Sequence, residues 1–319
     1  MGKKLKRFFK YFREYQWSNI YAMIKNGGRD PEICSETYTG KLVVITGATS
    51  GIGHLAARKY ASMGANLLCI NRSQEKSEAL KNEIETEFGV RCDFKIADLS
   101  LMDQVHQVAL ELSQIELPID VLIFNAGIYL TKKEITPDGF DRVFAVHYLS
   151  YFIITYRLME KLKSQAKSRI ILVNSEGHRF AAWGLHVDDL NWDHHRYSGL
   201  KSYGSAKLAQ LLSMLVFEEK FRDSGVTINA MHPGAVKTDT GQENGKVYLW
   251  YKKNMLDKIL KSPSVSAEAL YYLGVSSDLD RVSGKFFSLT TQEEPSPPAL
   301  DMEVAYDVWE LSNELAGFK

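Results

Sequence analysis

The stretch Leu42-Val-Val-Ile-Thr-Gly-Ala-Thr-Ser-Gly-Ile-Gly53 joins an uninterrupted apolar run to a glycine-rich turn. The apolar run has the length and composition of a buried strand, and an amphipathic helical pattern begins directly after the turn. Glycines let a backbone approach a pyrophosphate closely, and the N-terminus of the following helix favours its negative charge. The stretch therefore predicts a strand, a turn and a helix that bind a dinucleotide; a tight turn without a ligand is the alternative.

Short apolar runs alternate with amphipathic stretches along the rest of the chain. The expected strands lie at 42–45, 66–70, 92–96, 121–124, 170–173, 226–230 and 285–289, and helices are expected at 73–88, 101–112 and 304–315, among others. Continuous apolar strands that alternate with helices indicate a parallel sheet covered on both faces. We therefore predict an α/β fold, a Rossmann-like doubly wound sheet in a single domain, with ligands at the carboxyl ends of the strands.

The composition is that of an ordinary globular protein, with 45% hydrophobic and 24% charged residues. Lys and Arg together number 39, as do Asp and Glu, so the overall charge does not point to a nucleic acid partner. Cys34, Cys69 and Cys92 form neither a disulfide framework nor a zinc pattern, which favours a reducing intracellular compartment and no metal site. No apolar run reaches 18 residues, so we expect no transmembrane helix.

Residues 1–30 form a basic segment whose aromatic and aliphatic residues recur at roughly helical spacing. Such a helix could lie in a membrane interface, which would place the protein peripherally on the endoplasmic reticulum or another membrane. It could also dock its apolar stripe on the domain, or be a cleavable mitochondrial presequence. We expect residues 1–38 to be this extension and its linker, and residues 39–319 to be the dinucleotide-binding domain.

The stretch Tyr203-Gly-Ser-Ala-Lys207 places a phenol and an ammonium group four residues apart, on one face of a predicted helix. A neighbouring ammonium stabilises phenolate and lowers the pKa of the phenol from about 10. Hydride that reaches a carbonyl carbon leaves an alkoxide, which a tyrosine of this kind can protonate. Together with the glycine-rich turn, the pair predicts hydride transfer with a nicotinamide cofactor and Tyr203 as the acid.

From about Lys41 to its C-terminus the chain resembles the short-chain dehydrogenase/reductase family, and most closely the retinol dehydrogenase-like group. The resemblance implies cofactor-binding residues in spaced motifs: Gly47, Ser50, Gly51, Ile52 and Gly53; Asp98 and Leu99; Asn125, Ala126 and Gly127; Pro233, Gly234 and Thr238; and Tyr203 and Lys207. It also implies that Ser175 hydrogen-bonds the substrate oxygen, that Tyr203 transfers the proton, and that Lys207 lowers the pKa of Tyr203 and holds the nicotinamide ribose. Without Tyr203, Ser175 would be interpreted as a hydroxyl that caps a turn.

Arg72 follows the second predicted strand, where this fold places the adenine ribose. An acidic residue there would accept a hydrogen bond from the 2′-hydroxyl of NAD, whereas an arginine suits a 2′-phosphate. We therefore expect NADP(H) rather than NAD(H). A solvated arginine with no role in binding is the alternative.

His147 departs from the family pattern. The segment Phe144-Ala-Val-His-Tyr-Leu149 has histidine where the family usually has an asparagine that helps position a water in the proton relay from the lysine. Imidazole donates and accepts hydrogen bonds and titrates near neutrality, so the relay either survives in a more pH-sensitive form or is impaired. A histidine packed in a helix contact without proton transfer is the third interpretation.

Residues 240–262 correspond to the family's substrate lid, and their aromatic and aliphatic side chains favour a bulky apolar substrate. The same side chains could instead pack against the domain or a second subunit, so a homodimer stays open. We expect an NADP(H)-dependent enzyme that interconverts a carbonyl and an alcohol on a retinoid, a sterol or a long-chain aldehyde or ketone. The alternative is an NADP(H)-binding protein with weakened catalysis that acts through a partner or a membrane surface.

Overall fold

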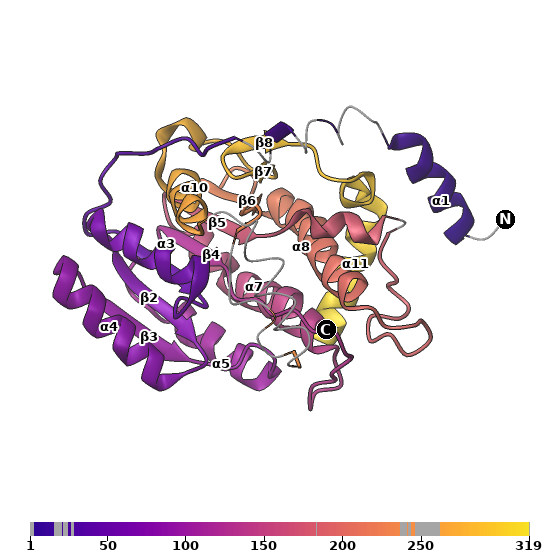
Figure 1. Ribbon diagram of the computed structural model, residues 1–319, viewed down its shortest axis with the longest axis horizontal. Coiled ribbons are helices and arrows are strands. Elements are labelled where there is room, and N and C mark those ends of the chain that lie inside the picture. Colours follow the sequence, from indigo (N-terminus) through magenta and orange to yellow (C-terminus); the bar gives the residue numbers. More distant parts are fainter. Residues whose placement is uncertain are drawn as a thin grey trace.

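A central sheet crosses the molecule, and helices cover both of its faces (Figure 1). The structure is a computed structural model that describes residues 3–15, 21, 25–26, 29–182, 184–236, 241, 244–245 and 262–318, with the backbone alone for residues 3–8. Thr238 and nearly all of the expected lid lie outside the described residues.

Among the described residues, eight strands form one sheet in the order β3-β2-β1-β4-β5-β6-β7-β8. The strands are β1 (Leu42–Thr46), β2 (Asn66–Asn71), β3 (Cys92–Ile96), β4 (Val121–Phe124), β5 (Ser168–Val173), β6 (Val226–His232), β7 (Phe286–Ser288) and β8 (Thr291–Glu293). Strands β1 to β7 are parallel, which confirms the predicted doubly wound sheet. Strand β8, which the sequence did not predict, pairs antiparallel with β7 and ends the sheet.

The helices fall into two layers, one on each face of the sheet. Helices α5 (Met102–Ser113), α7 (Ser150–Lys163), α8 (Gly199–Phe221) and α11 (Met302–Leu315) share one hydrophobic cluster. Helices α3 (Gly51–Ser62), α4 (Gln74–Phe88) and α10 (Ser264–Val275) share the other. Successive residues of β1 divide between the clusters, Val43 and Ile45 in one and Leu42 and Val44 in the other, because side chains alternate across a strand.

The chain between β4 and α7 is irregular. The short helix α6 (Arg142–Phe144) continues into a single π-helical turn, η1 (Ala145–Leu149), before α7 begins. The residue pattern of this segment does not reveal the π turn. Short 3-10 helices follow at η2 (Glu176–Ala181), η4 (Ser277–Leu279) and η5 (Pro297–Leu300). Turns of the π type often mark functional sites, and η1 contains His147.

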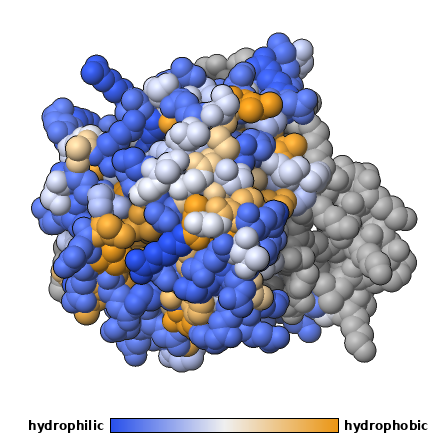
Figure 2. All heavy atoms as spheres, turned by 90° about the vertical axis from the view of Figure 1, so that its left-hand side faces the viewer, coloured by the Kyte–Doolittle hydropathy of each residue, from blue (hydrophilic) through white to orange (hydrophobic). Residues whose placement is uncertain are grey.

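The face of the molecule that carries α3 and α4 is mostly hydrophilic (Figure 2). Arg58 on α3 pairs with Glu83 and Glu87 on α4, so the two helices present linked charges to solvent. Apolar groups appear there only as small separate clusters, as is usual for a protein surface.

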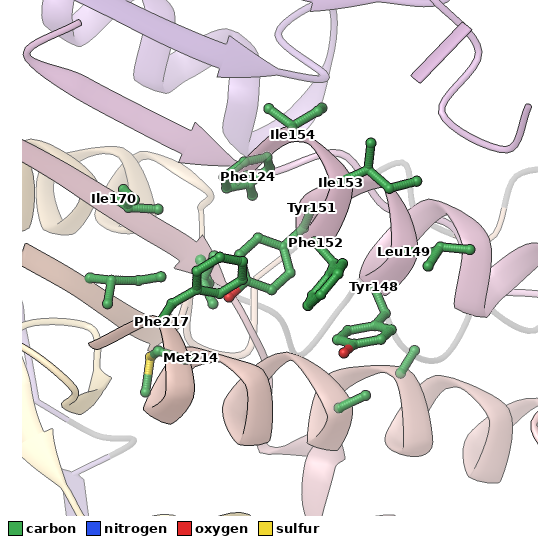
Figure 3. Packing of buried hydrophobic residues seen from close by; sticks show 14 of the residues in the cluster. Phe124, Tyr148, Leu149, Tyr151, Phe152, Ile153, Ile154, Ile170, Met214 and Phe217 are labelled. Atoms are coloured by element: carbon green, nitrogen blue, oxygen red, sulfur yellow. The ribbon is translucent and has the colours of Figure 1, made fainter. Parts of the chain in front are cut away.

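Aromatic side chains fill the core between β4, α7 and α8 (Figure 3). Phe152 and Phe217 are fully buried with ring centroids 5.6 Å apart, and Phe217 lies 4.7 Å from Trp309 of α11. Truncating either phenylalanine to alanine would cost about 3–5 kcal/mol in a core of this kind. This packing fixes α8, which carries Tyr203 and Lys207, against the sheet.

Helix α1 (Lys3–Glu14) docks on the domain through one face. Tyr11 is fully buried, and its hydroxyl donates to Oδ2 of Asp301 at 2.9 Å, as does Nζ of Lys10 at the same distance. Phe9 and Phe12 remain 46% and 64% exposed. Within the described part of the chain, no helix is both long and apolar enough to span a membrane.

Candidate active site

A cleft of about 430 Å³ opens where the parallel strands end. Most of the predicted site residues line it: Gly47, Ser50, Gly51, Ile52, Arg72, Asp98, Leu99, Asn125, Ala126, Gly127, His147, Ser175, Tyr203, Lys207, Pro233 and Gly234. The structure therefore brings together side chains that are far apart in the sequence, because each follows a strand whose carboxyl end lies at this edge.

Glycine is required in the first turn for two different reasons. Gly47 and Gly51 have φ values of +70° and +56°, and a Cβ on Gly47 would lie 2.9 Å from Cα of Ala126. Gly53 does not line the cleft; a Cβ there would lie 2.1 Å from the carbonyl oxygen of Gly47, so it permits close packing behind the turn. The turn thus leaves a cradle of backbone at the N-terminus of α3, which fits a pyrophosphate.

Thr46 and Asn125 lock this turn to the end of β4. Oγ1 of Thr46 accepts from the backbone N–H groups of Asn125 and Ala126, both at 3.0 Å. In return, Nδ2 of Asn125 donates to the carbonyl oxygen of Gly47 at 2.8 Å. The Asn-Ala-Gly motif therefore supports the floor of the cleft from below.

At the other end of the cleft, β2 ends in an uncharged side chain. Asn71 is buried; its Oδ1 accepts from the N–H of Ala48 at 2.8 Å, and its Nδ2 donates to Oγ of Ser77 at 3.1 Å. Arg72 and Lys76 both line the cleft beside it. Lys76 is a basic residue that sequence reasoning missed, although its position four residues after Arg72 could have indicated it.

Ser175 and Tyr203 meet at the end of β5. The Ser175 hydroxyl hydrogen-bonds the Tyr203 side chain and accepts from the N–H of Gly177 at 3.0 Å. Lys207 projects into the same space from one turn further along α8, and its Nζ lies 5.7 Å from the Tyr203 ring centroid. The three predicted catalytic side chains therefore occupy one wall of the cleft.

Burial dominates the protonation of this group. It raises the pKa of Tyr203, which the Ser175 hydrogen bond partly offsets, and lowers the pKa of Lys207 to about 7. Burial therefore sets the direction of the shift at Tyr203, and the expectation that Lys207 lowers this pKa stays a prediction. Nζ of Lys207 donates to the carbonyl oxygen of Val173 at 2.7 Å.

His147 is buried beneath the cleft and meets Tyr203 edge to face, with centroids 5.2 Å apart. Its Nε2 lies 2.8 Å from O and 3.0 Å from N of Ile128, whereas its Nδ1 has no hydrogen-bond partner among the described residues. Burial, and then the charge of Lys207, hold its pKa well below the usual range. The predicted titration of this imidazole near neutrality is therefore wrong, because the ring stays neutral there.

His178 lies behind the site. It is fully buried, with Nδ1 2.8 Å from the carbonyl oxygen of Ser175 and Nε2 accepting from the N–H of Ser296 at 3.0 Å. It therefore braces the loop that carries Ser175 and does not face the cleft.

Comparisons with known proteins agree with this geometry. Residues 41–185 match the family model for short chain dehydrogenases. Human retinol dehydrogenase 13 is 35% identical over 92% of this chain and 89% of its own length. The chain belongs to the short-chain dehydrogenase/reductase family. Mouse retinol dehydrogenase 14 is 31% identical over 92% of this chain and 90% of its own length.

Solved structures of similar fold include an uncharacterised protein from Mycobacterium paratuberculosis, with a TM-score of 0.69 and 25% identity over 88% of this chain and 95% of that one. A short-chain dehydrogenase from Shigella flexneri, complexed with NADP, has a TM-score of 0.61 and 20% identity over 80% of this chain and 99% of that one. As a family member of the retinol dehydrogenase-like group, the protein is an oxidoreductase that uses a nicotinamide cofactor and acts on CH–OH groups.

Proposed function

We propose that the protein is an NADP(H)-dependent oxidoreductase of a bulky apolar alcohol or carbonyl, with Tyr203 as its general acid and base. The observation that carries this proposal is the convergence of Ser175, Tyr203 and Lys207 on one wall of the cleft that the glycine turn opens. The nicotinamide cofactor supplies or accepts the hydride. The residues of the chain then have to hold and protonate the substrate oxygen.

In the direction of reduction, Ser175 holds the carbonyl oxygen and Tyr203 gives it a proton. Burial raises the pKa of Tyr203, so the phenol is protonated at neutral pH and ready to donate. Lys207 stabilises the phenolate that remains. Because the pKa of Lys207 is about 7, this lysine loses its charge as the pH rises through neutrality. These properties favour reduction over oxidation near neutral pH.

The preference for NADP(H) rests on the charge at the end of β2. Two cationic side chains, Arg72 and Lys76, line the cleft where the adenine ribose would lie, next to the neutral Asn71. A 2′-phosphate there would gain two cationic neighbours, whereas the buried Asn71 amide already has partners for its oxygen and nitrogen.

The substrate class rests on the relatives and on the mouth of the cleft. Two relatives that each cover 92% of this chain are named retinol dehydrogenases. Tyr129 packs edge to face on Tyr203 with centroids 6.1 Å apart, which gives the reacting region an aromatic wall. Asn244 holds this wall, because its Nδ2 donates to the carbonyl oxygen of Tyr129 at 2.6 Å and its Oδ1 accepts from the N–H of Thr131 at 2.6 Å. A retinoid, a sterol or a long-chain aldehyde or ketone would suit such a site.

We also propose that residues 1–38 are an extension of a catalytic domain at 39–319, and that they touch a membrane peripherally. Helix α1 uses Tyr11 to dock on the domain while Phe9 and Phe12 stay exposed beside the cation Arg13. Exposed aromatic side chains next to basic ones suit the interface of an anionic bilayer. Sedimentation of the protein with anionic and with neutral vesicles tests this contact. If the protein sedimented with neither kind of vesicle, the proposal would be contradicted.

The test of the catalytic proposal is NADPH consumption with retinal and a panel of apolar aldehydes and ketones. Tyr203→Phe should abolish turnover while NADPH still binds, as read by fluorescence titration. Tyr306→Phe is the control, because it removes a hydroxyl from an exposed tyrosine of α11 that does not line the cleft, and it should retain turnover. Tight NADPH binding without turnover by the wild type would favour the alternative, a binding protein with weakened catalysis.

A further inference from the structure

We infer that Gln210 is the positioning residue of this site, because its side-chain amide joins the lysine, the serine strand and the π turn in one hydrogen-bonded unit. Gln210 lies on α8 one turn after Lys207 and is 2% exposed. The inference rests on the catalytic roles proposed above for Ser175 and Lys207, and no motif in the sequence singled this residue out.

The first contact is with Lys207. Oε1 of Gln210 accepts from Nζ of Lys207 at 3.2 Å, and the carbonyl oxygen of Val173 accepts from the same Nζ at 2.7 Å. Residues three apart on a helix lie on one face, so the glutamine is well placed to hold the lysine from its own helix. The two acceptors fix the ammonium group at the bottom of the cleft and favour its charged form, against the effect of burial.

The second contact leads to Ser175 through Asn174. Nδ2 of Asn174 donates to Oε1 of Gln210 at 3.0 Å and to the carbonyl oxygen of Lys207 at 2.9 Å. Oδ1 of Asn174 accepts from the N–H of Ser175 at 2.8 Å. The end of β5, and with it the serine, is therefore tied to α8 through two side-chain amides.

The third contact is with the π turn. Nε2 of Gln210 donates to the carbonyl oxygen of His147 at 2.7 Å. His147 thus contributes a backbone carbonyl to this unit, while its neutral ring packs on Tyr203. The backbone carbonyl is present whether residue 147 is histidine or the family's asparagine. The π turn is therefore connected to Lys207 through this carbonyl and Gln210, and not through the side chain of residue 147.

The chemistry of its neighbours also fixes the orientation of the Gln210 amide. Two donors, Nζ of Lys207 and Nδ2 of Asn174, face one end, and an acceptor, the carbonyl oxygen of His147, faces the other. The reversed amide would set donors against donors and an acceptor against an acceptor. A carboxylate in this place would keep the first two contacts and lose the third, and an apolar side chain would lose all of them.

The experiment compares Gln210→Met, Gln210→Glu and the control Ser213→Ala. Ser213 is buried one turn further along α8, and its hydroxyl donates to the backbone oxygen of Gln210 without touching Lys207. For NADPH-dependent reduction, Gln210→Met should lower kcat roughly 10-fold or more, because the lysine and the serine strand lose their common support. KM should change less than kcat, and Ser213→Ala should keep the wild-type pH profile.

The pH dependence of kcat distinguishes a positioning role from a merely structural one, because loss of structural support alone would not shift it. Loss of an acceptor in Gln210→Met favours the neutral amine, so the alkaline limb of kcat should move to lower pH. The added carboxylate in Gln210→Glu favours the ammonium, so the limb should move to higher pH. Gln210→Glu keeps the shape of the side chain, so it preserves the test if Gln210→Met does not fold.

Labelling of Lys207 by a small amine-reactive reagent, followed by mass spectrometry across pH, tests the same point without turnover. Opposite shifts of the labelling midpoint in the two variants would support the inference even if the wild type reduced no carbonyl and the catalytic proposal failed. Midpoints and pH profiles identical to the wild type in both variants would overturn it.

Discussion

The ring of Tyr203 packs directly on the backbone of Gly177: a Cβ added to this glycine would lie 2.7 Å from Cε1 of the ring and 3.2 Å from Oγ of Ser175. Contacts shorter than 3.0 Å are not tolerated, so the ring would have to move. The space that places the phenol beside the serine is therefore made by a glycine that does not itself line the cleft.

Gly177→Ala should lower kcat by roughly 10- to 100-fold, because a displacement of the acid by even 1 Å is costly for catalysis. The affinity for NADPH should change little, since the cradle for the pyrophosphate lies at Gly47 and Gly51. Steady-state rates and fluorescence titration on the same preparation measure both. A variant that turns over at the wild-type rate would show that the ring is not held where the packing indicates.

Arg72→Ala should weaken NADPH binding by roughly 10- to 100-fold, the value of a lost hydrogen bond between charged groups, and should hardly affect NADH. Lys76→Ala should act in the same direction. Lys81→Ala is the control on α4, because Lys81 pairs with Glu85 and Asp93 and does not line the cleft. An equal loss of affinity for NADPH and NADH would contradict the assignment of a 2′-phosphate site.

Two histidines that folding desolvates, the buried His178 and the half-buried His232, should make the protein sensitive to acid. Burial lowers the pKa of His178 to about 3 and that of His232 to about 4, against an ordinary value near 6.5. Below about 6.5 the unfolded chain therefore binds protons that the folded chain does not, and the free energy of unfolding should fall by up to about 1.4 kcal/mol per pH unit for each group. This contribution is fully present above 6.5 and is lost as the pH falls towards 4.

Urea titrations between pH 7.5 and 5 measure this slope. A free energy of unfolding that stayed flat over this range would contradict the burial of neutral imidazoles.

The docking of α1 can be tested at Tyr11. Tyr11→Phe removes the hydroxyl that donates to the Asp301 carboxylate and should lower the free energy of unfolding by about 1–3 kcal/mol, as expected for a buried hydrogen bond to a charged group. Tyr21→Phe is the matched control, because this side chain is largely exposed. If both variants unfolded at the wild-type urea concentration, the helix would not be anchored as the structure has it.

Local patterns explain how much of the fold the sequence predicts. Each parallel strand is a short apolar run, because both faces of the sheet are covered, and the seven predicted strands appear within a few residues of their expected bounds. The glycine turn, Asn125 and the Tyr203–Lys207 pair are visible for a similar reason: their spacing is set by one turn or one helix. Because ligands bind at the carboxyl ends of the strands in a doubly wound sheet, these motifs can be assigned to one cleft before any contact between them is known.

The features that the sequence does not reveal depend on contacts between distant segments. Gln210 resembles any polar residue on a helix until Asn174 and the carbonyl of His147 are placed around it. The direction of the pKa shift of Tyr203 depends on burial, which the spacing to Lys207 cannot supply. Strand β8 is too short and polar to carry a pattern, and it forms because β7 offers it an edge.

The contact between Tyr11 and Asp301 joins residues 290 positions apart. During synthesis at 5–20 residues per second, about 15–60 s would pass between the appearance of the tyrosine and that of its partner. Throughout that time helix α1 lacks its partner Asp301, and its aromatic, basic surface is open to chaperones or to a bilayer. The extension is therefore made long before the contact that holds Tyr11 on the domain can form.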